Sequence, residues 1–120
     1  MTNILETWLL AYKDAWETQN PDKIVQIFTE DAVYWETPFL KHEGRDAIYQ
    51  YWKDAPGAQK DISFRYKILN ADEGLSHWSA TFFSGGRSHE LDGIFMLTFD
   101  AQGRCQVLRE WWHSKENSCS

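Results

Sequence analysis

Apolar side chains in the first half of the chain recur every three or four residues, which is the spacing of one helix face. A first helix is predicted after Asn3 and a second, short helix at Asn20-Pro21, because asparagine caps helices well and proline fits their first turn. A third helix is predicted from Arg45 or Asp46 to the breaker Pro56-Gly57. The predicted buried stripes are Leu5, Trp8, Leu9, Tyr12 and Trp16; Ile24, Ile27 and Phe28; and Ile48, Tyr51 and Trp52.

Beyond the third helix the hydrophobic pattern changes to strict alternation, which is typical of strands that bury one face. Turn signals separate four predicted strands, at residues 62–68, 75–83, 88–99 and 103–113. A shorter strand is predicted at residues 32–38, where proline closes it, and residues 41–44 are predicted to be a loop. The chain is therefore predicted to be α+β, with three helices packed on one face of a curved, mainly antiparallel sheet.

Length and charge limit what the chain can be. At 120 residues it is predicted to be one domain over residues 1–120. A net charge of −6 argues against nucleic acid and anionic membranes as partners. The sequence has no apolar run of membrane-spanning length and no opening typical of a signal peptide, so a cytoplasmic location is expected. Cys105 and Cys119 are expected to be reduced thiols.

The closing strand carries an acidic residue among apolar ones. Glu110 shares one strand face with Leu108 and Trp112, because side chains two positions apart point the same way. With seven Trp, seven Phe and five Tyr, the chain has enough rings to line a cavity as well as fill a core. In an aromatic pocket, burial would raise the pKa of Glu110 and suit it to proton transfer. Permanent pairing with an arginine or a ring N–H is the structural alternative.

The order of these motifs resembles nuclear transport factor 2-like domains of the SnoaL-like and ketosteroid isomerase-like branch. The stretches that carry the resemblance are residues 12–16, 22–33, 38, 44–48, 51–52, 91–95 and 99–104. The resemblance implies a cone in which three helices cover a strongly bent sheet around a deep pocket. It also implies homodimers through the outer sheet face. This fold hosts isomerases, dehydratases, cyclases, epoxide hydrolases and non-enzymatic binders.

The resemblance also implies roles for single residues. Tyr12 falls where ketosteroid isomerases keep the tyrosine that donates to the forming oxyanion. Glu36, counted from Asp31-Ala32, falls at the carboxylate base, whereas counting back from Pro38 selects Thr37. The family's protonated aspartate corresponds here to Phe95, which cannot donate a hydrogen bond. The residues implied to line the pocket are Trp52, Trp78, Ala80, Phe82, Phe95, Leu108 and Trp112, together with Glu110.

Asp92 is a further candidate because Gly93 follows it inside a predicted strand. A glycine there suggests a bulge that would turn Asp92 into the pocket, whereas unbroken alternation would send it to the outer face. For Tyr12 the structural alternative is a buried hydroxyl bonded to a backbone acceptor, and for Glu36 an exposed glutamate at a strand end. The four histidines form no metal-binding spacing with cysteines or carboxylates, so neither a metal nor another cofactor is expected.

The sequence therefore predicts a small acid–base enzyme that acts without a cofactor on a hydrophobic, oxygen-bearing compound. Its reaction would be of the isomerase, cyclase, dehydratase or epoxide hydrolase type, with Glu36 and Glu110 moving protons and Tyr12 polarising an oxygen. One alternative is a binding module that holds an apolar ligand without turnover. A second alternative is a structural or association domain.

Overall fold

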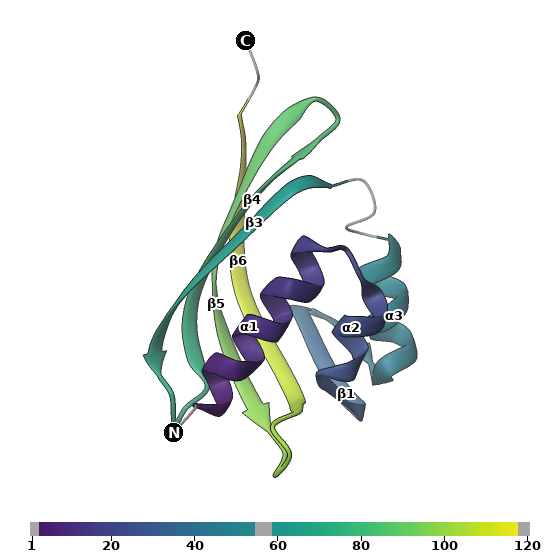
Figure 1. Ribbon diagram of the computed structural model, residues 1–120, viewed down its shortest axis with the longest axis vertical. Helices are drawn as coiled ribbons and strands as arrows, with labels where there is room; N and C mark the ends of the chain where they lie inside the picture. Colours follow the sequence, from purple (N-terminus) through teal and green to yellow (C-terminus); the bar gives the residue numbers. More distant parts are fainter. Residues whose placement is uncertain (1–2, 55–58, 118–120) are drawn as a thin grey trace.

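The computed structural model describes residues 3–54 and 59–117, and it places three helices on one side of a long curved sheet (Figure 1). The predicted α+β class and helix-on-sheet arrangement are confirmed. The predicted helix stop at Pro56-Gly57 and the thiol of Cys119 lie outside the described residues. The helices are α1 (Ile4–Glu17), α2 (Pro21–Gln26) and α3 (Gly44–Asp54). The strands are β1 (Phe28–Thr37), β2 (Leu40–Glu43), β3 (Lys60–Asn70), β4 (Leu75–Ser84), β5 (Arg87–Phe99) and β6 (Cys105–Asn117).

The first two helices begin at the predicted caps. The Asn3 side chain accepts a hydrogen bond from the Leu5 backbone N–H at 2.8 Å. Asn20 accepts from the N–H groups of Asp22 and Lys23, with Pro21 in the first helical turn. Side-chain oxygens thus take up donors that a helix start leaves without partners, which explains why both helices begin there.

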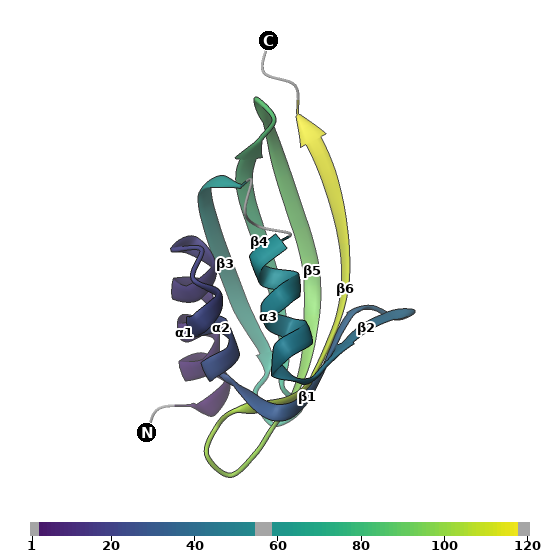
Figure 2. The same cartoon turned by 90° about the vertical axis from the view of Figure 1, so that its right-hand side faces the viewer.

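The sheet has the strand order β2-β1-β6-β5-β4-β3. Strands β3 to β6 form the predicted antiparallel meander. Strand β6 then pairs in parallel with β1, with Tyr34 beside Leu108. Figure 2 shows β4, β5 and β6 rising beyond the helices while α1, α2 and α3 cover the lower part of the sheet. The long strands therefore carry the concave face past the helical layer.

Two details of the first strands differ from the prediction. Residues 40–43 form the edge strand β2 rather than part of a loop, and they pair antiparallel with β1. Their polar side chains give no alternation, because an edge strand packs little of its surface. Phe28 begins β1 instead of ending the second helix, since α2 stops at Gln26. Phe28 is nevertheless fully buried, so its apolar character reflects packing rather than a helical stripe.

Aromatic rings dominate the core between α1 and the sheet. Trp8 stacks on Tyr12 with ring centroids 5.1 Å apart, and Phe95 stacks on Trp78 at 5.2 Å. Gly93 makes room for this packing, because an added Cβ would lie 2.8 Å from Trp112 Cβ and 3.0 Å from Trp78 Cε2. The middle of the sheet is therefore filled by rings, and the space left beside them forms the cavity described next.

Candidate functional site

A cavity of about 340 Å³ lies between the helices and the concave face of the sheet. Its lining combines rings with a few polar groups and includes no lysine or arginine among the described residues. Side chains of α1, α3 and four strands, β1, β4, β5 and β6, reach it, so it is assembled from most of the fold. The lining residues are Tyr12, Trp16, Tyr34, Glu36, Tyr51, Trp52, Gln59, Trp78, Phe82, His89, Leu91, Glu110, Trp112 and Ser114.

Glu110 is the buried acid of this cavity. Its position in β6 turns it to the concave face, where it is only 5% exposed. Its Oε2 atom has no hydrogen-bond partner among the described residues, so the pairing with arginine or a ring N–H is not seen for that atom. Burial raises the pKa of Glu110 well above its usual value, and the nearby charge of Glu36 raises this pKa further. Burial therefore favours the neutral, protonated form of this carboxyl.

Three phenol groups surround the same region. The hydroxyls of Tyr12 and Tyr34 are fully buried and hydrogen-bond to each other. Burial raises the pKa of both phenols and of Tyr51, and the charge of Glu110, when it is ionised, adds to each shift. All three phenols stay protonated over the ordinary pH range. Together with protonated Glu110 they give the cavity several hydrogen-bond donors.

Glu36 is the second carboxyl of the cavity, and it is held differently. It lies near the end of β1, and its Oε1 is 3.0 Å from Nε2 of His42 in β2. Its backbone carbonyl accepts a hydrogen bond from Trp112 Nε1 at 2.8 Å. Thr37 lies outside the cavity lining, and its hydroxyl accepts from the Phe39 N–H. The residue counted from Asp31-Ala32, rather than the one counted from Pro38, thus reaches the cavity.

Four tryptophans form the walls. Trp52 and Trp78 have indole N–H groups without a hydrogen-bond partner among the described residues, whereas Trp16 donates to Gln59 Oε1 at 2.8 Å. Trp112 closes the side next to Glu36. Phe82 lies against His89, with ring centroids 5.1 Å apart. The walls therefore suit a flat apolar ligand.

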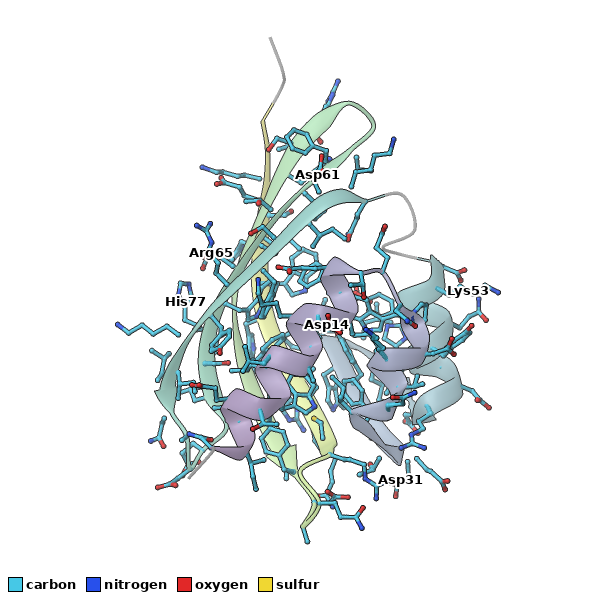
Figure 3. All side chains as sticks on the ribbon, viewed as in Figure 1. Asp14, Asp31, Lys53, Asp61, Arg65 and His77 are labelled. Carbon is cyan, nitrogen blue, oxygen red and sulfur yellow. The ribbon has the colours of Figure 1, made fainter. Side chains whose placement is uncertain are left out.

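Asp92 does not join these groups. Its side chain is 67% exposed on the outer face, where Oδ1 lies 2.9 Å from His77 Nε2. In Figure 3, His77 projects from the side of the sheet away from the helices. The β4–β5 register runs without a shift past Gly93, so the bulge that would turn Asp92 inward is absent. The inward interpretation is wrong, because this glycine makes room for rings instead of marking a bulge.

Phe95 and Leu108 are fully buried but lie outside the cavity lining. Phe95 packs edge-on against Tyr12 with ring centroids 5.4 Å apart and stacks on Trp78. Leu108 belongs to the same hydrophobic core. Both were predicted to contact the ligand, and both instead lie in the core behind the cavity lining. Ala80 is likewise buried without lining the cavity.

The cavity also contains residues that were not predicted as part of it. Tyr34 could have been found from alternation, because it lies two positions before Glu36 on the same face of β1. Tyr51 and Trp16 were predicted only as buried stripe residues of their helices. His89 was considered only for metal-binding spacing. Alternation could have found His89 and Leu91, which share the Phe95 face of β5, and Ser114, which shares the Glu110 face of β6. Gln59 has no such signal.

The described part of the chain contains neither a cluster of metal ligands nor a membrane-spanning helix. Within residues 3–54 and 59–117, no three His, Cys, Asp or Glu side chains come together as ligands for a metal ion. In the same ranges, no helix has the length and apolarity needed to cross a membrane.

Solved structures of this architecture are functionally diverse. The epoxide hydrolase/cyclase-like enzyme SalBIII, from pyran ring formation in the polyether salinomycin, has 17% identity and a TM-score of 0.77, covering 91% of this chain and 90% of SalBIII. A Δ5-3-ketosteroid isomerase from Mycobacterium sp. has 11% identity and a TM-score of 0.81, covering 97% and 100%. A computationally designed 17-OHP binder has 10% identity and a TM-score of 0.81, covering 99% and 100%. These likenesses show the fold.

The family itself is shown by the sequence. A search of curated proteins found no match. The family model of the SnoaL-like domain, however, matches residues 9–107, which run from within α1 to the start of β6. The chain therefore belongs to the SnoaL-like domain family.

Proposed function

We propose that this protein is an acid–base enzyme that acts on a hydrophobic, oxygen-bearing small molecule held in the cavity. The observation that carries the proposal is Glu110, a deeply buried carboxyl whose Oε2 has no partner among the described residues and whose pKa is raised by burial. A buried polar atom without a hydrogen bond lowers the stability of the fold, so a purely structural role does not explain this carboxyl. Membership of the SnoaL-like family supports a small-molecule isomerase or cyclase.

In the proposed reaction, Glu110 would act as the general acid and Glu36 as the general base. In its protonated form, which burial favours, Glu110 can give a proton, or a hydrogen bond, to a carbonyl, hydroxyl or epoxide oxygen. The hydroxyl of Tyr12 can support the same oxygen as negative charge develops on it. Glu36, paired with His42, can accept a proton from a carbon or a hydroxyl of the ligand. Such a division fits isomerisation, dehydration, cyclisation and epoxide opening.

The lining also indicates which ligands would bind. Anions are disfavoured, because the cavity holds two carboxyls and no lysine or arginine among the described residues. The tryptophan and tyrosine rings favour a flat or polycyclic apolar body. The available donors favour a ligand with acceptor oxygens. These features together describe a neutral, oxygenated hydrocarbon skeleton.

Turnover assays on defined compounds test the proposal. A Δ5-3-ketosteroid and a hydrophobic epoxy alcohol would be incubated with the wild type, Glu36→Gln, Glu110→Gln and Tyr12→Phe, with Glu43→Gln as a surface carboxyl control. We expect Glu36→Gln and Glu110→Gln each to reduce turnover of an accepted compound by roughly 10²–10⁴-fold, and the control Glu43→Gln to leave it unchanged. Full turnover by both Gln variants would refute the acid–base mechanism.

A binding module without turnover is the second candidate, favoured by the likeness to a designed 17-OHP binder of the same fold. It predicts tight binding of a neutral apolar ligand that Glu36→Gln and Glu110→Gln barely change. Thermal-shift titration detects such binding directly, because a ligand of the folded state raises apparent stability. Binding at equal affinity by wild type and both variants, without product formation, would favour this candidate.

We further propose that the protein forms a homodimer through the outer face of the sheet. Met96 and Trp111 support this, since they are 43% and 45% exposed and alternate with inward residues of β5 and β6. Sedimentation at micromolar concentration tests it, and a monomer there would count against this arrangement.

A further inference from the structure

We propose that His42 is a positioning residue that holds the Glu36 carboxyl in place at the cavity and aims it at the ligand. The proposal rests on the proposed role of Glu36 as proton acceptor. His42 itself lies outside the cavity lining, so it would act through Glu36 and not on the ligand.

The local backbone brings the two side chains together. In the β1–β2 ladder His42 lies directly opposite Tyr34, so both rings occupy the same face of the sheet. The register then shifts, with Trp35 opposite Lys41 but Thr37 opposite Leu40. Glu36 is the extra residue of this bulge, and bulges re-aim side chains. The bulge leaves its Oε1 at 3.0 Å from His42 Nε2.

The imidazole is fixed from two further sides. Its ring stacks on Tyr51 of α3 with centroids 4.4 Å apart and planes 20° apart. Tyr34 approaches at 6.0 Å and 66°. The side chains of His42 and Glu36 are only 20% and 18% exposed, so water competes weakly for their hydrogen bond. Because β1, β2 and α3 already hold the His42 ring in place, the ring loses little conformational freedom when its Nε2–H donates to Glu36. The direction of this hydrogen bond is therefore fixed.

The contact has a defined effect on Glu36. The Nε2–H of His42 donates to one carboxylate oxygen, which leaves the second oxygen for a ligand proton. The charge on Glu36 also acts on Glu110, since it is the second cause of the raised pKa there. His42, Glu36 and Glu110 thus form a series in which each side chain acts on the next. The other titratable groups beside this series are Tyr12, Tyr34 and Tyr51.

Two NMR measurements test the proposal without any substrate. The first follows the His42 ring N–H, which should appear as a downfield proton resonance protected from exchange. We expect this resonance in the wild type and in Glu110→Gln, and its loss in His42→Phe. In Glu36→Gln it should shift upfield or broaden, because a neutral amide is a weaker acceptor. An absent resonance in the wild type, or an unchanged one in Glu36→Gln, would overturn the proposal.

The second measurement follows the Glu110 carboxyl through a pH titration with ¹³C-labelled glutamate. Glu36→Gln should lower the Glu110 midpoint, because a negative neighbour is removed. His42→Phe keeps a ring against Tyr51 but cannot donate, and it should lower the Glu110 midpoint by about 0.5 unit or more, because a Glu36 carboxylate that is no longer held turns away and repels the charge on Glu110 less. His42→Gln, which keeps a donor, should stay closer to the wild type.

If His42→Phe leaves the Glu110 midpoint unchanged, His42 only stabilises the β1–β2 hairpin, and the proposal is overturned. A midpoint that Glu36→Gln leaves unchanged would break the series at its second step and overturn the proposal as well. Both outcomes are independent of turnover. Loss of activity in Glu36→Gln with an unaltered titration in His42→Phe would reject this inference and leave the proposed function intact.

Discussion

Glu110 lies directly opposite Phe95 in the β5–β6 ladder. Residues paired in this way present their side chains on the same face, a few ångströms apart. Phe95 stands where ketosteroid isomerase-like sequences keep a protonated acid, and here it is fully buried core. In this chain the buried acid is instead Glu110, whose side chain reaches the same region from the neighbouring strand β6. The proposed acid–base chemistry therefore depends on β6, which carries Glu110.

Glu110→Gln should change how stability depends on pH. The raised pKa means that the folded chain holds this proton more tightly than the unfolded chain does. Its stabilising effect is complete below the ordinary value of 4.5 and is lost as the pH rises through the folded-state pKa. Between pH 4.5 and the folded-state pKa, the wild type should lose about 1.4 kcal/mol relative to Glu110→Gln for each pH unit.

Urea unfolding at several pH values measures this difference, with Glu43→Gln as the control. Glu43 is a surface partner of Lys41 with a 60% exposed side chain, so its substitution should leave the pH profile parallel to that of the wild type. Parallel profiles for Glu110→Gln would show that Glu110 is not a buried, protonated acid.

The hydroxyls of Tyr12 and Tyr34 should be energetically coupled. Each is buried and bonded to the other, so Tyr12→Phe or Tyr34→Phe alone leaves one hydroxyl unsatisfied and should cost about 1–3 kcal/mol. The double variant should cost less than the sum by about 0.5–1.5 kcal/mol. A double-mutant cycle by urea unfolding gives the value, and additive losses would mean that the two hydroxyls do not share a hydrogen bond in solution.

Gly93→Ala should destabilise the sheet and deform the cavity wall. The new Cβ would meet the Trp111 carbonyl oxygen at 2.6 Å, and backbone cannot move away as a flexible side chain can. We expect a loss of about 1–3 kcal/mol and a change in tryptophan fluorescence, because Trp78 and Trp112 flank the site. The control is Gly85→Asn, where nothing lies within 4 Å and asparagine tolerates the positive φ. Equal stability losses in both variants would contradict the packing explanation.

Ser76→Ala should leave stability unchanged or raise it. Ser76 is fully buried in β4, and its hydroxyl has no partner among the described residues. Removing an unsatisfied buried hydroxyl relieves a desolvation penalty of about 1 kcal/mol. Thermal unfolding of the variant checks this, and a clear drop in the midpoint would indicate that an ordered water satisfies the hydroxyl.

The helix starts and the meander could be predicted because their causes are local. Asn3 and Asn20 cap the helices that they precede in sequence, and alternation in β3 to β6 follows from one buried face. The edge strand β2 could not be predicted in this way, since Lys41, His42 and Glu43 acquire strand geometry only by pairing with β1. Parallel pairing of β1 with β6 is equally non-local.

The candidate site was predictable in part for the same reason. Alternation places Glu110 on the concave face, and the family resemblance predicts Tyr12 and Glu36 as site residues. The role of His42 depends on a bulge that shifts the register by one residue, which no local pattern reveals. Asp92 was misjudged because a glycine in a strand can mark either a bulge or a close approach of rings, and only tertiary packing distinguishes these.

The parallel pairing of Tyr34 in β1 with Leu108 in β6 has a consequence for the order of folding. Glu36 and Glu110 sit on these two strands, which are separated by most of the chain. Contacts between segments so distant in sequence form late, because a long loop must close first. An intermediate can hold the β3–β6 meander, with Glu110, before β1 brings Glu36 beside it. Ligand binding during refolding should therefore appear only with the slowest phase, when β1 pairs with β6.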